Sequence, residues 1–242
     1  CEAYHKPYKF LQSPAMRSRA SWLFNAILLC TVSSAAQNAL AASTTLEYKG
    51  FAYSSSGGTI YADLNPAKYG LESKSVVAGG FNMIEKSTGT SLIAWCVDVF
   101  HALNNKFEYT IGNSSQLNRA DDLQKLVNQR YAEVTDKKTS TAFQLAIWEI
   151  VTDTGGGYSL ANGTFQASGF GNAQALAGNW LKLDGKTSGN YKINYFYDGI
   201  MNDKTIAQNL ISISSVPLPG AAILMLSALG LGGLLHRRRR IA

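Results

Sequence analysis

The sequence has few of the residues that usually build catalytic and metal sites. Its 242 residues include three cysteines and three histidines. Between the apolar segments near its two ends, only Cys96 and His101 remain. One cysteine cannot form a disulfide within the chain, and one cysteine with one histidine falls short of the ligand set of a zinc site. We therefore expect no cofactor and no metal.

The chain also lacks the concentrated charge of a nucleic-acid-binding protein. Its formal net charge is +6, but eight of its 22 basic residues lie outside residues 42–216, against one of its 16 acidic residues. The region between keeps 14 basic and 15 acidic residues and is close to neutral. It has no basic patch interleaved with aromatic residues, so nucleic acid is not an expected partner. The glycine-rich stretch 154–159 lacks the Lys-Ser/Thr ending of a phosphate-binding loop.

The N-terminal region has the order of a secretory signal peptide. Arg17 and Arg19 precede an apolar stretch over residues 22–32, and Ala39-Leu40-Ala41 has the small residues of a cleavage site. Residues 16–41 are therefore predicted to be removed on export.

The C-terminal region has three parts. Val216-Pro217-Leu218-Pro219 comes first, an apolar run continues to Leu235, and the block Arg237, Arg238, Arg239 and Arg240 follows. The run is about 20 residues long, enough to cross a bilayer, and the arginines predict a cytoplasmic C-terminus. A plain tail anchor would have these features as well.

This tripartite end closely resembles the PEP-CTERM sorting signals of Gram-negative bacteria, in their V-P-L-P variant. The resemblance implies export, transient anchoring in the inner membrane, and removal of residues 216–242 by an exosortase-type sorting enzyme. Delivery to the cell surface or to an exopolysaccharide matrix would follow. Residues 1–15 are then an upstream extension outside the native protein, and residues 42–215 form one mature domain.

Within that domain the pattern changes from strands to helices. Residues 45–56, 59–64, 75–85 and 90–100 are rich in β-branched and aromatic residues, and Gly, Ser, Asn and Pro separate them. Helical spacing follows over 118–134, 136–153 and 172–183, and strand-like segments return at 191–199 and 205–214. The predicted fold class is α+β, with a β-rich sandwich or barrel-like sheet and a packed helical portion.

Two of these segments carry the residues of interest. Strand alternation over 90–100 places Trp95, Val97 and Val99 on one face and Cys96 with Asp98 on the other. In the helix from about Thr139 or Ser140 to Val151, only Gln144 and Glu149 interrupt an apolar circumference, which predicts a buried helix. A buried Gln144 needs hydrogen-bond partners, because an unsatisfied amide costs about 1–3 kcal/mol.

Cys96 and Gln144 are together the reagents of an internal thioester. A sulfur nucleophile attacks the side-chain amide carbon, ammonia leaves, and Sγ becomes bonded to Cδ. Proximity and a dry site favour this reaction, and dryness also slows hydrolysis of the product. Two apolar segments that each carry one reagent fit these needs.

The stretches "WCVDVF" and "FQLAIWEI" resemble the two signature stretches of bacterial thioester domains, first recognised in surface adhesins. Trp95, Cys96, Val97 and Asp98 match the first stretch, and Gln144, Ala146, Ile147 and Trp148 match the second. The resemblance implies that Cys96 and Gln144 carry the bond, while Trp95, Asp98, Ala146 and Trp148 shape its surroundings. Phe143 stands where many of those domains have Thr.

The expected function is therefore one-time covalent attachment of an exported surface or matrix protein to a protein amine or a glycan hydroxyl, for adhesion or cross-linking. This is a self-modification without turnover. The alternative is a non-reactive matrix protein in which Cys96 is buried or bridges two chains. A Cys-His hydrolase is disfavoured, because His101 lies five positions along the expected strand and would project from the opposite face.

Overall fold

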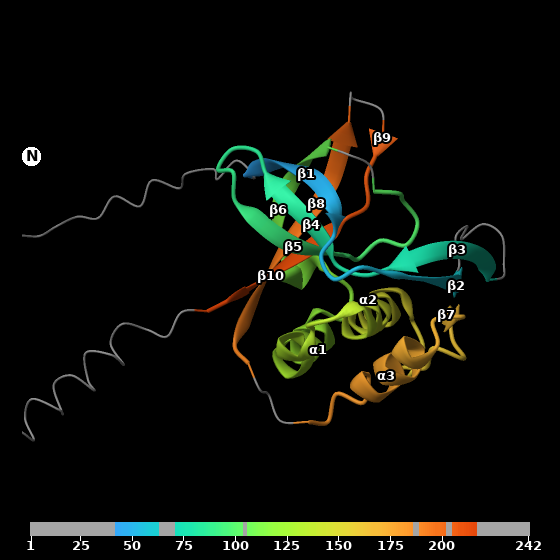
Figure 1. Cartoon of the computed structure of the whole chain (residues 1–242). Coiled ribbons are helices and arrows are strands. Elements are labelled where there is room, and N and C mark those ends of the chain that lie inside the picture. The colour runs from blue at the N-terminus through green and yellow to red at the C-terminus, as the bar shows by residue number, and fades with distance from the viewer. Residues whose placement is uncertain (1–41, 63–70, 104–105, 186–188, 202–204, 217–242) are drawn as a thin grey trace, which may run out of the picture. The chain divides into compact units, whose positions relative to one another are not determined.

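The computed structural model describes residues 42–62, 71–103, 106–185, 189–201 and 205–216. Within them, six antiparallel strands close into a barrel in the order β10-β5-β4-β1-β6-β8, and β8 pairs back onto β10 (Figure 1). A short strand, β9, extends β8 outside the ring. The bounds are β1 Ser43–Phe51, β4 Phe81–Glu85, β5 Ser91–Cys96, β6 Lys106–Asn113, β8 Tyr191–Met201, β9 Thr205–Ile206 and β10 Leu210–Ser215.

A helical portion packs against the barrel, and a second sheet packs against the helical portion. The second sheet has the order β3-β2-β7, and α2 contacts strands of both sheets and both other helices (Figure 1). The bounds are β2 Ser56–Ala62, β3 Glu72–Ala78, β7 Phe165–Ser168, α1 Ala120–Arg130, α2 Lys137–Thr152 and α3 Asn172–Trp180, with 3₁₀ turns at Ser114–Gln116 and Tyr131–Glu133. The predicted α+β class, with a barrel-like sheet and a packed helical portion, is confirmed.

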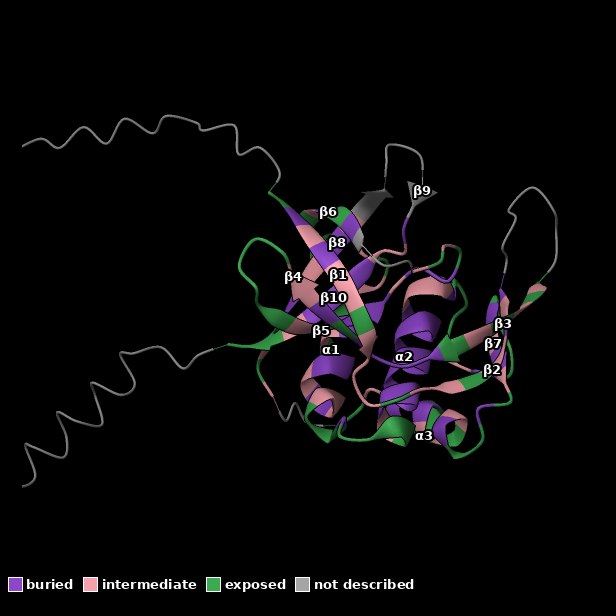
Figure 2. Ribbon diagram, turned by 45° about the horizontal axis from the view of Figure 1, so that its top comes forward, coloured by how far each residue is buried: buried purple, intermediate pink, exposed green. Residues whose placement is uncertain are grey.

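Helix α2 is buried over most of its length, as its composition predicts (Figure 2). It begins one turn earlier than expected, because Asp136 rather than Thr139 or Ser140 is the N-cap. The Asp136 carboxylate accepts the Thr139 N–H at 2.8 Å, and the Thr139 hydroxyl accepts the Asp136 N–H at 3.0 Å. This reciprocal capping satisfies two of the N–H groups that every helix start leaves unpaired.

The segment 75–85 forms two strands in different sheets, where the sequence pattern suggested one. The break falls at Gly79-Gly80, between β3 and β4. A Cβ on Gly80 would lie 2.9 Å from the indole ring of Trp95, so only glycine allows the chain to pass that close to the ring. Strands β6 and β7 were also not predicted individually.

Candidate functional site

Cys96 is the last residue of β5, and its main-chain N–H and C=O have no partner in the described strands. Toward β10 the pairing continues, and the Val97 N–H donates to the Asn209 carbonyl at 3.0 Å. On the other side β4 begins at Phe81, opposite Ala94, and does not reach Cys96. The N–H and C=O of Cys96 therefore lie past the end of β4 and need another partner, since buried peptide groups are costly to leave unpaired.

The side-chain amide of Gln144 is that partner. The Cys96 N–H donates to Gln144 Oε1 at 3.0 Å, and Gln144 Nε2 donates to the Cys96 carbonyl at 2.7 Å. Neither residue has any exposed surface. Because Oε1 and Nε2 are both bonded to Cδ, the two hydrogen bonds hold that carbon beside the residue that carries the thiol. The expected burial of Gln144 with partners is confirmed, and the two sequence motifs meet.

The residues that precede the pair pack against each other. The rings of Trp95 and Phe143 meet edge-to-face, with centroids 4.9 Å apart and planes at 75°. Near the start of α2, the Ser140 hydroxyl accepts the Gly80 N–H at 3.0 Å. These contacts fix the helix against β5, because buried aromatic pairs and satisfied buried polar groups both restrict sliding.

The Cys96 thiol lies against the main chain of the loop after β5. It donates to the Asp98 carbonyl at 2.9 Å and accepts the Asp98 N–H at 3.3 Å. Burial raises the pKa of Cys96 to about 12, and the Asp98 carboxylate adds to the rise. The Trp148 indole, the Asp98 main chain and the Lys74 cation act against it. The thiol is therefore protonated at neutral pH, and an attack on the amide must include transfer of its proton.

The expected strand faces are wrong beyond Cys96, because β5 ends there. Trp95 and Cys96 are both fully buried, although they point to opposite sides of the strand. Asp98 belongs to the following loop. Alternation of side chains holds only within a strand, so the position of Asp98 relative to Cys96 could not be taken from spacing.

The same loop brings Asp98 and His101 together. Asp98 Oδ1 accepts the Phe100 N–H at 2.9 Å, and Oδ2 lies 2.6 Å from His101 Nδ1. The expectation that His101 projects from the face opposite Cys96 assumed that the strand continues to His101. Because β5 ends at Cys96, that expectation is wrong. Among the described residues, the side chain of His101 pairs with Asp98 and not with Cys96. Sequence reasoning missed this pair, although the three-residue spacing was visible.

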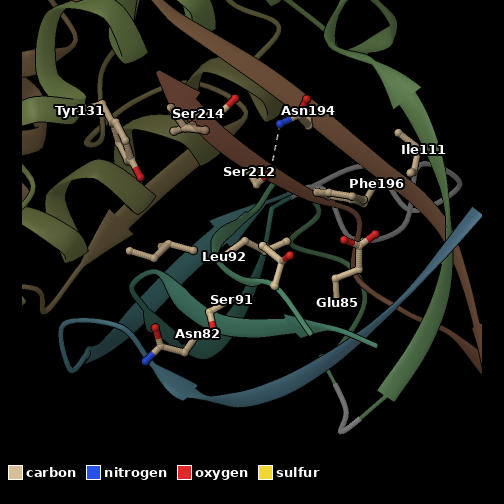
Figure 3. A pocket seen from close by; sticks show the side chains of 13 residues that line it. Asn82, Glu85, Ser91, Leu92, Ile111, Tyr131, Asn194, Phe196, Ser212 and Ser214 are labelled. Atoms are coloured by element: carbon tan, nitrogen blue, oxygen red, sulfur yellow. Dashed lines mark hydrogen bonds between the residues drawn. The ribbon is translucent and has the colours of Figure 1, made fainter. Parts of the chain in front are cut away.

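Two of the cavities among the described residues lie at different parts of the molecule. A small one of about 190 Å³ is lined by side chains that include Lys74, His101 and Trp148. A larger one of about 580 Å³ lies among the barrel strands and is shown in Figure 3. Its lining is partly polar, with Asn194 donating to Ser212 at 3.3 Å, and it shares no residue with the small cavity. Of these two, only the small cavity has a thioester-motif residue, Trp148, in its wall.

The remaining predicted residues divide into two groups. Ala146 has no exposed surface and Trp148 is 3% exposed, both on α2. Val216 is exposed after β10, whereas Pro217, Leu218, Pro219 and Arg237 to Arg240 lie outside the described residues. In the described part of the chain, no helix has the length and hydropathy to span a membrane. Nor does that part contain a cluster of three or more Cys, His, Asp or Glu side chains suited to a metal.

Comparison with known proteins leaves the site to be interpreted from its geometry. No protein-family model matches this chain, and no curated protein matches it either.

Proposed function

We propose that this protein forms an internal thioester between Cys96 Sγ and Gln144 Cδ and uses it once for covalent attachment. The observation that carries the proposal is the pair of hydrogen bonds between the Gln144 amide and the Cys96 main chain. These bonds bring the amide to the residue that carries the single cysteine thiol in the described part of the chain.

The geometry supplies part of the chemistry of bond formation. The Cys96 N–H already donates to Gln144 Oε1, which polarises the carbonyl and would stabilise the oxyanion formed on attack. Sγ forms a bond to Cδ, the Cδ–Nε2 bond breaks, and the thiol proton leaves with the nitrogen as ammonia. Atoms balance without a co-reactant. Burial of both residues then protects the thioester from water.

We further propose that the protein acts after export, on the cell surface or in an exopolysaccharide matrix, as its C-terminal resemblance suggests. A sorting enzyme of the exosortase type would cut near Val216-Pro217-Leu218-Pro219. Mass spectrometry of the protein recovered from the cell surface should find no peptide containing Arg237 to Arg240. Recovery of those arginines on the surface protein would favour a permanent tail anchor instead.

The main alternative is a non-reactive matrix protein, and one observation favours it. Burial of Cys96 and its raised pKa are typical of an inert core cysteine. The same burial argues against a disulfide between chains, which needs an accessible thiol. The two candidates differ in whether the amide nitrogen of Gln144 is retained, and mass measures this directly.

The test is the intact mass of the exported protein, purified without exposure to amines or high pH. A thioester lowers the mass by about 17 Da, one ammonia, and leaves no thiol to alkylate. Methylamine should then add to Gln144 and release the Cys96 thiol. A mass equal to that of the sequence, with an alkylatable Cys96, would contradict the thioester and support the non-reactive matrix protein.

Two substitutions serve as controls. Cys96→Ala and Gln144→Ala should each abolish the mass deficit, and the second should leave an alkylatable thiol. A deficit that survives Cys96→Ala would indicate that Gln144 has lost its nitrogen to another group, such as a lysine amine. That result would also contradict the proposal.

A further inference from the structure

The loop after β5 builds a histidine-carboxylate pair that the proposed bond formation does not use. Asp98 Oδ2 lies 2.6 Å from His101 Nδ1, and the Asp98 side chain is only 10% exposed. The carboxylate is itself held by the Phe100 N–H. His101 keeps 41% of its side chain exposed, and its Nε2 has no hydrogen-bond partner among the described residues. A carboxylate at Nδ1 holds the proton on that nitrogen and leaves Nε2 as an acceptor.

Asp98 connects His101 to the thiol, because its main chain bonds Cys96 Sγ while its carboxylate meets His101 Nδ1. His101 lines the small cavity, and so does Trp148, which follows Gln144 by one turn of α2. At about 190 Å³ the space is smaller than an ordinary ligand pocket and suits the end of a side chain or one hydroxymethyl group. It therefore offers an incoming group a place beside His101 and Trp148.

The charge in the wall selects among nucleophiles. Lys74 lines the same cavity, and its Nζ donates to the Val99 carbonyl at 3.2 Å. Its cation disfavours a protonated amine, whereas a neutral alcohol meets no such repulsion. An alcohol is also the nucleophile that most needs a base, because it must lose its proton as it attacks.

We propose that His101, oriented by Asp98, is the general base that activates an alcohol for attack on the thioester. This inference rests on the proposed function and specifies its substrate class. The alcohol oxygen bonds to Gln144 Cδ, the Cδ–Sγ bond breaks, and the alcohol proton passes to His101 Nε2 and then to the departing sulfur. The products are an ester at Gln144 and a free Cys96 thiol, so no other reactant is needed.

The test measures release of the Cys96 thiol from the exported protein with three probes. Methyl glucoside and N-acetylserinamide supply sugar and side-chain hydroxyls, and methylamine is the amine. In His101→Gln, the rates with the alcohols should fall about 10²–10⁴-fold, the usual contribution of acid-base catalysis, while the methylamine rate changes less than about tenfold. Whichever alcohol reacts with the wild type identifies the source of the hydroxyl, and reaction with neither overturns the inference.

Further variants separate chemistry from structure. Added imidazole should restore alcohol opening in His101→Ala, which a merely structural role would not allow. Asp98→Asn should also slow the alcohols, because an amide can donate to Nδ1 and would then move the histidine proton to Nε2. Lys125→Gln removes a lysine that pairs with Asp122 on α1, outside the cavity, and should leave all rates unchanged.

The two levels of the proposal fail in different ways. If His101→Gln keeps its mass deficit of about 17 Da but alcohol and amine rates stay unchanged or fall equally, the base is wrong and the thioester stands. If the wild type has no deficit, the thioester itself is wrong.

Discussion

At the scale of single residues, Glu149 is the group on α2 most affected by burial. It has no exposed surface, and its carboxylate accepts the Ser159 N–H at 2.6 Å. Burial raises the pKa of Glu149 from its ordinary value of 4.5 to about 7, and the neighbouring Asp153 adds to the rise. Burial also acts to raise the pKa of Asp153, but hydrogen bonds from Gly155 and Thr164 outweigh it and lower that pKa. The proton of the pair therefore belongs to Glu149.

The raised pKa predicts a loss of stability as pH increases. Between pH 4.5 and about 7 the folded protein keeps the Glu149 proton that the unfolded chain has released. Stability from this group is thus fully present below pH 4.5 and falls until about pH 7. Urea unfolding at a series of pH values should show this slope, and Glu149→Gln should flatten it. The carboxyls with lowered pKa, such as Asp153, act in the opposite direction at lower pH.

Glu133→Gln is the matched control for that measurement. Its side chain is 49% exposed in a surface pair with Arg130, so it should keep the wild-type slope. A wild-type slope in Glu149→Gln would contradict the assignment of the proton to Glu149.

The surroundings of a single residue could be predicted from the sequence where the composition of its own helix or strand determined them. Gln144 had to be buried and hydrogen-bonded because its helix is apolar on every side, and it is. The contact between Asp98 and His101 depends on where β5 ends, which no residue near Cys96 marks in the sequence. The bond of Gln144 to the Cys96 main chain, rather than to side chains, depends on β4 starting at Phe81.

At the scale of elements, the helices were easier to predict than the strands. Each of α1, α2 and α3 has a local apolar period, and α2 has a capping residue within four positions of the expected start. Strand assignment depends on partners that are distant in sequence. The segment 75–85 is continuous in composition, yet β3 pairs with β2 and β4 pairs with β1 and β5. The bend at Gly80 is required by Trp95, which a local pattern cannot reveal.

The closure of the barrel also could not be predicted from local sequence patterns. Strand β10 pairs with β5 through Leu210↔Cys96 and with β8 through Leu210↔Phe196. The pairing with β5 joins residues 114 positions apart, so the sequence pattern indicated a sheet and left sandwich and barrel open.

At the scale of the whole molecule, the proposed bond would join the barrel to the helical portion. Cys96 ends a barrel strand and Gln144 lies in α2, 48 residues later. The intervening chain includes β6 and α1. A covalent link across such a loop restricts the unfolded chain in the way that a disulfide does, and chain-entropy arguments give about 4 kcal/mol for this length.

This predicts that opening the thioester lowers the free energy of unfolding by about 4 kcal/mol. Ammonia is the informative nucleophile, because it restores the amide of Gln144 and leaves both side chains as encoded. The hydrogen bonds of Gln144 to Cys96 can then re-form, so the loss reports on the link and not on packing. Urea unfolding before and after treatment, with ammonia retained to prevent re-closure, measures the difference.

Mass separates that reaction from hydrolysis, which would leave a glutamate at position 144 and a product about 1 Da heavier than the amide. The distinction matters, because a carboxylate buried beside the Cys96 carbonyl would destabilise the fold for an unrelated reason. Cys96→Ser never forms the link, so its unfolding should resemble that of the ammonia-opened protein and should not respond to ammonia. If opening leaves the free energy of unfolding unchanged while the mass returns to the sequence value, the link does not restrict the unfolded chain. The thioester would then serve attachment alone, and the stability of the joined barrel and helices would come entirely from contacts such as Trp95 with Phe143.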